Sequence, residues 1–564
     1  MSTNQNNLSP VERIKTKSDA LRGTLKQSLQ DSATGALRED DQSVVKFHGM
    51  YQQDDRDRRE ERSAKKLEWL YSYMIRLRLP GGLLTPQQWV GLHHIAGEHS
   101  TGTIKITTRQ TIQLHGILKS HVKPTIKAFN TLQLDSIAAC GDVNRNVVCN
   151  AHPHQSELHA EIFSYAAKIS EMALPKTRAY YEVWLDEQPL LNKEEEADPL
   201  YQDRYLPRKF KVAIAIPPYN DVDVFANDLG LIAIVENNKL IGFNIAAGGG
   251  LGATHGNANT YPRLGTILGF VEPGEKTLKA VYEIITVQRD NGNRSDRKLS
   301  RLKYTIDKMG VEAFKAEVEA RCGFALEPAK PFEFTQRRDD YGWFQNHEGN
   351  WYYTVFTESG RVLDDDKVAL KTAMLEIAKT GAANFRFTCN QNLILSDIAP
   401  ADKPAIESLL HQFGIIEHTE NAGAMRKSAI ACVAFNTCSL ALAEAQRYLP
   451  TLITRLEPIL AKHGLSDDDI SIRMTGCPNG CGRPYAAEIG LIGTAYGQYN
   501  LHIGGDRYGY RLNTKYKENL DEPAILAELD TLLGTYSRER NTGETFGDFT
   551  IRNNWVQTNP KSAS

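Results

Sequence analysis

The chain has 564 residues, of which 41% are hydrophobic and 24% are charged, as in ordinary folded globular proteins. Lys and Arg total 66 and Asp and Glu total 69, and this balance gives no support to a nucleic-acid binder, which would carry an excess of basic residues. No apolar run approaches the roughly 20 residues of a membrane span, and the first residues lack the charged-then-apolar pattern of a secretion signal. We therefore expect a cytoplasmic protein of several domains, with no membrane partner.

The first segment, residues 1–75, differs in composition from the rest of the chain. Residues 1–45 are rich in Ser, Asn, Gln and Asp and contain few aromatic residues, which predicts a mobile arm that orders on a partner. Residues 54–62 mix both charge signs at helical spacing, which is typical of a solvated helix face. We interpret residues 1–75 as an N-terminal arm and partner-docking segment.

Two segments far apart in the chain resemble each other. Residues 103–115 and residues 384–396 both alternate apolar and polar side chains across a Thr-x-x-Gln turn, which predicts a β-hairpin in each. Each segment follows a helix-like stretch, residues 87–97 and 367–379 respectively. The chain therefore contains an internal repeat.

A second pair of similar segments extends this repeat. Residues 228–232 read Asp-Leu-Gly-Leu-Ile and residues 488–492 read Glu-Ile-Gly-Leu-Ile, and each runs through a β-like stretch to glycines. Two similar halves in tandem predict an α+β fold of pseudo-twofold symmetry, with a site between the halves. The copies differ at polar positions, since Arg109 stands where the second copy has Asn390, and His115 where it has Ser396.

Four of the 8 cysteines lie close together in the sequence, and 8 is too few for a disulfide framework in a chain of this length. Five residues separate Cys432 from Cys438, and three separate Cys477 from Cys481. Four thiolates can hold one soft metal centre, and the Pro and Gly residues around the second pair suit a tight loop with backbone N–H groups directed at sulfur.

Three interpretations of these cysteines remain open from spacing alone. Buried structural cysteines are common, but Cys-Pro-Asn-Gly-Cys-Gly is a poor core sequence. Zinc sites favour two to four residues between paired ligands, and five fits less well. An iron–sulfur cluster is the interpretation that the spacing favours.

Basic residues gather beside several strand-like segments. Lys209 and Lys211 alternate on one face of a segment that continues into a buried strand, and two neighbouring cations repel each other unless an anion joins them. The pattern therefore predicts a pocket for an anion. The other basic positions in this group are Arg76, Arg78, Arg145, Arg208, Arg294, Arg297 and Arg301.

A nicotinamide site is not expected in this chain. Residues 248–253 fit the Gly-rich dinucleotide fingerprint only formally, because no helix follows them and no acidic residue stands at the distance needed for the ribose. Electrons for any reduction should therefore come from another protein.

The two cysteine pairs, read as Ala-Cys432-Val-Ala-Phe-Asn-Thr-Cys438 and Thr-Gly-Cys477-Pro-Asn-Gly-Cys481-Gly, resemble the cluster signature of the sirohaem-dependent sulfite and nitrite reductases. The resemblance extends over residues 46–552, almost the whole chain. It implies a [4Fe–4S] cluster on the four cysteines, with Cys481 also bridging to the iron of sirohaem. It implies that Arg78, Arg145, Lys209 and Lys211 bind the substrate, and that Arg109, Gln113, His115, Arg208, Arg301 and Asn479 lie near the cofactors.

The resemblance also implies a domain organisation and a reaction. Residues 76–140 and 345–418 would be two joined ferredoxin-like repeats, residues 141–344 a domain for sirohaem and substrate, and residues 419–564 the domain of the iron–sulfur cluster. The reaction would be the six-electron reduction of sulfite to sulfide in assimilatory sulfur metabolism, with electrons from an NADPH-dependent flavoprotein or, as an alternative, ferredoxin. Nitrite reduction is the nearest alternative, and nitrite reductases typically have Asn where this chain has Lys211. A non-catalytic iron–sulfur or zinc protein is the alternative from another class.

Overall fold

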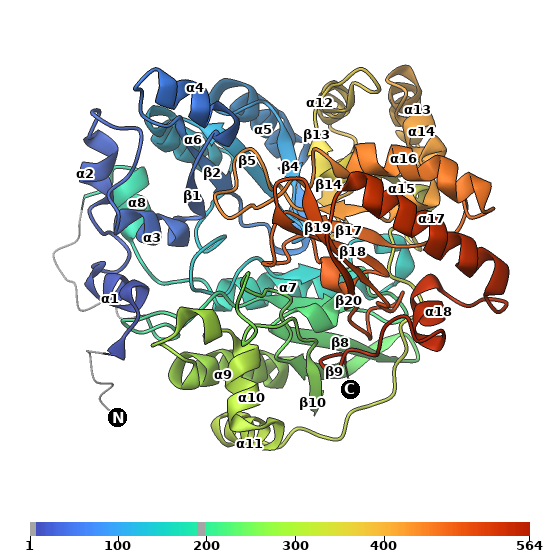
Figure 1. The fold of residues 1–564 in the computed structure, drawn as a ribbon. Helices are drawn as coiled ribbons and strands as arrows, with labels where there is room; N and C mark the ends of the chain where they lie inside the picture. Colours follow the sequence, from blue (N-terminus) through green and yellow to red (C-terminus); the bar gives the residue numbers. More distant parts are fainter. Residues whose placement is uncertain (1–6, 189–197, 564) are drawn as a thin grey trace.

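The computed structural model describes residues 7–188 and 198–563, which form four five-stranded sheets covered by helices (Figure 1). Within these residues no helix is both long and apolar enough to cross a bilayer. The sheets form two pairs. Their topologies repeat as the sequence predicted, which confirms the α+β fold with an internal pseudo-twofold repeat.

The first pair contains the two predicted hairpins. One sheet has the order β1-β2-β5-β4-β13 and the other β11-β12-β15-β14-β3. The hairpins are β4–β5 and β14–β15, and Gln110 and Gln391 at their turns both have positive φ angles of 48° and 71°. The strands are β1 (Met50–Asp54), β2 (Tyr71–Arg76), β3 (Leu83–Leu84), β4 (Ile104–Ile106), β5 (Ile112–Ile117), β11 (Gly342–Gln345), β12 (Trp351–Val355), β13 (Arg361–Val362), β14 (Asn384–Phe387) and β15 (Leu393–Ile398).

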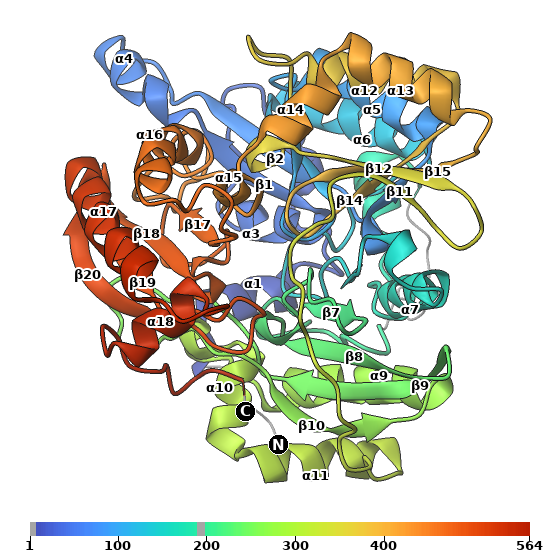
Figure 2. The same ribbon diagram turned by 90° about the vertical axis from the view of Figure 1, so that its right-hand side faces the viewer.

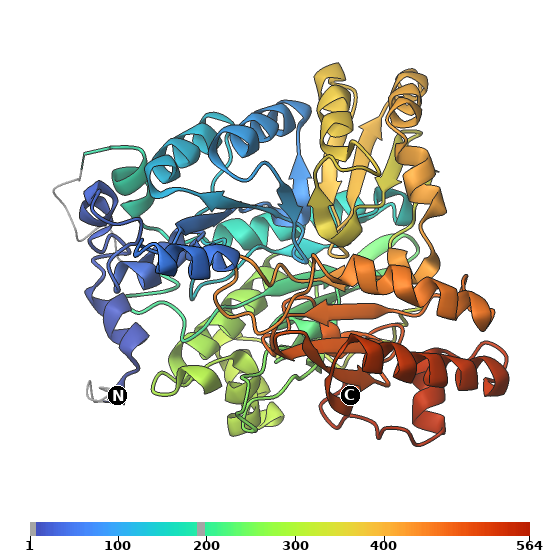
Figure 3. The ribbon, with the colours of Figure 1, turned by 45° about the horizontal axis from the view of Figure 1, so that its top comes forward.

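These two sheets exchange their short edge strands. β3 precedes the first hairpin in the chain but pairs with β14 of the second sheet, and β13 pairs in turn with β4 of the first sheet. Four helices cover the pair on its outer side (Figure 3): α5 (Pro86–His99), α6 (Lys119–Thr131), α12 (Leu370–Thr380) and α13 (Lys403–Gln412). The helix α5 begins at a capping box of Thr85 and Gln88, with Pro86 at its first position.

The second pair of sheets has the orders β6-β7-β8-β9-β10 and β16-β17-β18-β19-β20, each parallel over its first three strands and antiparallel after them. Gly230 and Gly490 stand at equivalent places, and a Cβ atom on either would lie within 3.0 Å of a carbonyl oxygen. The strands are β6 (Val148–Cys149), β7 (Val212–Ala215), β8 (Leu229–Glu236), β9 (Lys239–Ala247), β10 (Thr266–Val271), β16 (Ile430–Ala431), β17 (Ile472–Thr475), β18 (Ile489–Ala495), β19 (Gln498–Ile503) and β20 (Thr514–Leu520).

Separate groups of helices cover these two sheets (Figures 1 and 2). The first sheet has α7 (His159–Met172), α9 (Glu275–Asn291), α10 (Leu302–Met309) and α11 (Val311–Cys322), and the second has α16 (Leu449–Lys462), α17 (Glu522–Glu539) and α18 (Phe546–Arg552). Three further short helices are α8 (Ala179–Trp184), α14 (Ile415–Asn421) and α15 (Ala424–Lys427). A buried apolar cluster joins the two sheets and includes Phe225 and Tyr485.

The repeat brings equivalent residues into contact at the junction of the halves. The single-turn helices η7 (Val224–Ala226) and η10 (Pro484–Ala486) precede β8 and β18, and Asp223 and Arg483 directly before them both adopt the left-handed conformation. Asp223 accepts hydrogen bonds from Arg337 at 2.5 Å and from Arg473 at 2.7 Å, and it forms an ion pair with Arg483 at 2.6 Å. These three guanidinium groups hold the pKa of the buried Asp223 carboxyl well below its usual range, against the effect of burial.

The expectation of a mobile N-terminal arm does not hold for the described part of residues 1–75; residues 1–6 lie outside the described residues. The helices α1 (Pro10–Lys17), α2 (Leu25–Gln30) and α3 (Asp41–Val44) pack on the body of the molecule, with Leu21 and Leu25 buried. Lys15 forms an ion pair with Asp142 at 3.6 Å. The few apolar residues of this segment stand at positions where they pack against the core, and composition alone does not show position. The charged segment ends in α4 (Arg59–Ala64), none of whose residues is buried, as predicted.

Candidate active site

The four cysteines follow two neighbouring parallel strands. Cys432 comes directly after β16, and Cys477 lies two residues after the end of β17. The carboxyl ends of parallel strands meet at one edge of a sheet, which brings the two cysteine loops together. The second loop supplies donors to sulfur atoms of both loops: Gly476 N lies 3.3 Å from Cys432 Sγ, and Asn479 Nδ2 lies 3.4 Å from Cys477 Sγ.

The four thiols are close enough to perturb one another. Burial, and after it the Cys481 thiol, raises the pKa of Cys432 and of Cys477 to about 12. Burial, followed by Cys432 and Cys481, raises that of Cys438 to about 12. Four thiolates this close need a cationic centre among them, so the donor set fits a metal cluster held by sulfur. Cys481 is exposed, whereas Cys477 is buried.

Six of the predicted basic residues form one cluster in the first half of the molecule, within electrostatic range of Cys481. Lys209 interacts electrostatically with Cys481, Arg145, Arg208 and Arg301, and Lys211 with Lys209, Arg109 and Arg301. Burial, and after it Arg208, lowers the pKa of Lys209 to about 7. Burial, and after it Lys209, lowers the pKa of Lys211 well below its usual range.

Among the described residues, the carboxylates around this cluster are too few to balance it. Arg301 makes two bonds to Asp228, at 3.0 and 2.8 Å, and Arg208 lies 3.9 Å from Asp142. Asp142 is already shared with Arg297 and Lys15. A group with several carboxylates, such as sirohaem, and a small oxyanion both fit this excess of positive charge.

Arg78 is not brought together with these residues. Its guanidinium forms two bonds to Asp135, at 3.1 and 2.6 Å, and a third contact to Ser170 at 3.5 Å. Arg76, which the sequence analysis counted among the basic positions but did not assign to the substrate, is linked to this cluster instead. Arg76 donates to Gln113 Oε1 at 2.8 Å and to Cys140 Sγ at 3.2 Å, and Cys140 interacts electrostatically with Arg145.

Arg109, Gln113 and His115 lie on the first hairpin, and two of them link it to the cluster loop. His115 Nε2 lies 2.9 Å from Gln113, and His115 Nδ1 lies 3.2 Å from Thr437 Oγ1, between the first two cysteines. Burial, and after it Arg76, lowers the pKa of His115 to about 3, so this imidazole is neutral at pH 7. Arg109 is held by Asn227 at 2.7 Å and by Val212 O at 3.1 Å, and thus braces the hairpin against β7.

Lys105 is a further residue that the sequence analysis missed. It lies in β4, is 3% exposed, and donates to the carbonyl oxygen of Ser359. Burial lowers its pKa to about 7, and the nearby Cys432 thiol opposes this effect. In the sequence it was one polar position of an alternating strand, and nothing there marked it as buried.

Comparison with known proteins gives the same repeat and the same chemistry. Residues 70–132 and 344–413 match the nitrite/sulfite reductase ferredoxin-like half domain, and residues 164–326 match the nitrite and sulphite reductase 4Fe-4S domain. The last match falls on the half with β7–β10, whereas the four cysteines lie in its repeat, which contains β16–β20.

Curated relatives match over nearly their whole length. The chain is 66% identical to the "Sulfite reductase (NADPH) hemoprotein beta-component" of Leptospira biflexa serovar Patoc, over 96% of this chain and 98% of that protein. It is 52% identical to the protein of the same name from Myxococcus xanthus, over 97% and 96%. The solved structure of the Mycobacterium tuberculosis NirA protein shares the fold, with a TM-score of 0.78 and 23% identity over 97% of this chain and 96% of that one. The chain therefore belongs to the family of nitrite and sulfite reductases.

Proposed function

We propose that this chain is the haemoprotein component of an assimilatory sulfite reductase, an oxidoreductase that reduces sulfite to sulfide for cysteine biosynthesis. The observation that carries the proposal is the electrostatic interaction between the exposed Cys481 and Lys209, which places four clustered thiols close to a group of basic side chains with few carboxylate partners among the described residues. The relatives, named for this component, are 50–66% identical over nearly the whole chain.

The reaction consumes six electrons and eight protons: sulfite, SO₃²⁻, gives H₂S and three waters. When bound, sirohaem and the [4Fe–4S] cluster supply electrons one at a time to a bound sulfite ion. The protein supplies charge, position and protons. Cys432, Cys438, Cys477 and Cys481 would hold the cluster, with Cys481 shared with sirohaem.

The basic residues would bind the substrate. Lys209, Lys211 and Arg145 would neutralise the dianion, and we assign Arg76 rather than Arg78 to the fourth position. Burial lowers the pKa of Lys209 to about 7, so this lysine can give up a proton to an oxygen atom leaving sulfur near neutral pH, and burial lowers the pKa of Lys211 as well. Arg109, Arg208, Arg301, Gln113 and His115 would contact the carboxylates of sirohaem or support residues that do, and Asn479 would donate to the cluster sulfur.

The choice of sulfite over nitrite rests on charge. Lys211 adds a second cation beside Lys209, which favours a dianion over the monoanion nitrite. Turnover of the two anions with a reduced viologen as one-electron donor tests this choice. We expect a higher kcat/KM for sulfite in the natural protein, and a shift towards nitrite in the Lys211→Asn variant. Equal preference in both proteins would contradict the assignment.

The visible spectrum of the purified protein tests the cofactors. Tetrapyrrole bands are expected in the natural protein, and the Cys481→Ser variant should lose both the coupling of the two centres and sulfite reduction. A protein without tetrapyrrole bands would instead be an electron carrier or a structural module.

The electron donor and the cellular location stay predictions. An NADPH-dependent flavoprotein is the donor that the names of the relatives support, with ferredoxin as the alternative. Residues 1–75 remain our candidate for its docking segment. Because α1–α3 pack on the body, truncation would disturb the fold, and charge reversal at the exposed Lys17 and the partly exposed Lys26 is the cleaner test. Unchanged assembly with the flavoprotein would exclude this segment. We expect the complex in the cytoplasm.

A further inference from the structure

The repeat assigns every position of the first α/β half a counterpart in the second. The strand β8 begins at Leu229 and β18 at Ile489, and β7 and β17 end at Ala215 and Thr475, so equivalent residues are 260 positions apart in both places (489 − 229 and 475 − 215). On this correspondence Asp221 is the counterpart of Cys481. The residue after β6, Asn150, is likewise the counterpart of Cys432, the residue after β16.

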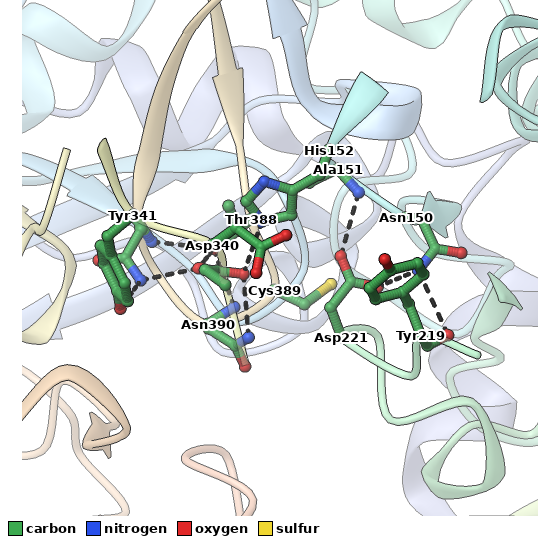
Figure 4. A network of polar contacts seen from close by, with 12 residues as sticks. Asn150, Ala151, His152, Tyr219, Asp221, Asp340, Tyr341, Thr388, Cys389 and Asn390 are labelled. Carbon is green, nitrogen blue, oxygen red and sulfur yellow. Dashed lines mark hydrogen bonds and ion pairs between the residues drawn. The ribbon is translucent and has the colours of Figure 1, made fainter. Parts of the chain in front are cut away.

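Metal-ligating side chains gather at this counterpart position too. His152, Asp221 and Asp339 are all buried, and one ligand atom from each lies within 4.8 Å of the others. Figure 4 shows His152 and Asp221 on the loops that follow β6 and β7, with Thr388 and Asn390 of the second hairpin beside them. His152 Nε2 lies 3.2 Å from Asp339 Oδ1.

The two carboxylates of this group have neutral donors around them. Asp221 accepts from the side chain of Asn150 and from Ala151 N, and Asp339 accepts from Thr388, Asn390 and Asn392. Within residues 7–188 and 198–563, no Lys or Arg forms an ion pair with either. Asp223, two residues beyond Asp221, is paired with three arginines, so the fold supplies counter-charge nearby but not here.

The imidazole of His152 also has an unused position. Its Nδ1 is buried and has no hydrogen-bond partner among the described residues. Burial raises the pKa of Asp221 to about 7, since His152 only partly offsets the loss of solvent. Two buried carboxylates and one imidazole without a full counter-charge are costly unless a cation joins them.

We propose that His152, Asp221 and Asp339 bind one divalent transition-metal cation, at the place in the first half that corresponds to the four-cysteine centre in the second. One imidazole and two carboxylates suit Zn²⁺ or Mn²⁺, and two carboxylates neutralise a dication. The cation would tie the loops after β6 and β7 to the second hairpin, through Asp339 and its partners Thr388 and Asn392. Its role is structural and independent of the sulfite reaction.

Zinc binding to the full-length holoenzyme tests this site. The protein is purified anaerobically, treated with EDTA, dialysed and titrated with Zn²⁺ alone, and zinc and iron are measured per chain by mass spectrometry. We expect one zinc per chain at unchanged iron content, together with a rise in Tm, because a ligand that binds only the folded state stabilises it. X-ray absorption at the zinc edge should show nitrogen and oxygen ligands at about 2.0–2.2 Å.

The matched variants are His152→Asn and His154→Asn. His154 is in the same loop, but it bonds to Asp340 at 3.0 Å and stacks on Phe344. We expect His154→Asn to bind zinc like the natural protein, and His152→Asn to bind at least about 100-fold more weakly, since it loses a direct ligand. Three outcomes would overturn the proposal: no zinc on the natural protein, equal affinity in both variants, or sulfur ligands at about 2.3 Å, which would place the zinc on the cysteines.

Discussion

Arg76 and Arg78 offer a matched pair for testing where the substrate binds. They are two residues apart at the end of β2, yet their guanidinium groups have different partners. Arg78 is neutralised by Asp135, with two bonds at 3.1 and 2.6 Å. Arg76 contacts Gln113 and Cys140, and within the described residues no carboxylate forms an ion pair with it. Its charge is therefore available to an anion.

The expected effects differ in kind. A unit charge about 4.5 Å from Arg76 at an effective dielectric constant of about 20 interacts by roughly 4 kcal/mol, and screening reduces this to about 2–3 kcal/mol. Arg76→Leu should therefore lower kcat/KM for sulfite by roughly 30- to 160-fold. Arg78→Leu removes a half-buried ion pair and should instead lower the free energy of unfolding by about 1–3 kcal/mol, with kcat/KM within about threefold of the natural value.

The assay is steady-state sulfite reduction with a reduced viologen, normalised to the sirohaem absorbance so that loss of cofactor is not counted as loss of activity. Denaturant unfolding of the same samples gives stability. Arg76→Lys is the control for charge. It should recover part of the activity, since lysine keeps the positive charge but lacks the planar set of N–H donors of a guanidinium group. The assignment would be refuted if Arg78→Leu lost as much kcat/KM as Arg76→Leu at full cofactor content.

Three further predictions concern single side chains. In the cofactor-free protein, sulfate should bind with constant affinity below about pH 7 and more weakly as the pH rises towards 10. The reason is that a bound dianion raises the lowered pKa of Lys209, so that binding takes up a proton above pH 7. Titration calorimetry measures the affinity, and an affinity independent of pH would contradict the prediction. Gln391→Ala removes hydrogen bonds to Ala431 N and O at 3.2 and 3.0 Å, and it should lower the free energy of unfolding by about 2–4 kcal/mol. Urea unfolding measures this loss, and a loss under about 0.5 kcal/mol, as for an exposed substitution, would contradict the prediction. Asp223→Asn leaves three buried arginines without their shared carboxylate and should destabilise the protein by about 3–5 kcal/mol. The control is Asp57→Asn, because Asp57 is exposed and pairs only at the surface with Arg447. Equal stability of the two variants would argue against a stabilising role for the Asp223 junction.

The sequence was sufficient to predict features that depend on residues close together in the chain. The cysteine spacing located the cluster loops because only a few residues separate the ligands within each pair. The Thr-x-x-Gln turns predicted both hairpins because alternation and turn chemistry are local properties. Lys209 and Lys211 were found for the same reason, since they flank the buried Phe210 at the start of a strand.

Properties set by distant contacts could not be predicted. Arg76 and Arg78 are two residues apart, so the alternation of a strand predicts the same face for both. The strand β2 ends at Arg76, and Arg78 bonds to Asp135, which is distant in the sequence, so the sequence did not show which arginine is left for an anion. The burial of Lys105 depends on Ser359, which is distant in the sequence. The N-terminal segment has a polar composition, and its packing depends on a few residues such as Leu21 and Leu25 that meet apolar partners only in the folded molecule.

The exchange of β3 and β13 between the hairpin sheets has a consequence for how the molecule comes apart. Each hairpin sheet completes its edge with two residues donated by the other half, so neither half retains a whole sheet when the two are pulled away from each other. Separation requires both ladders to break at once, and the unpaired edges of β4 and β14 would then be open to other strands. A polypeptide cut between residues 140 and 340 would thus yield fragments that need one another to fold, and the molecule should unfold as a single mechanical unit in a pulling experiment.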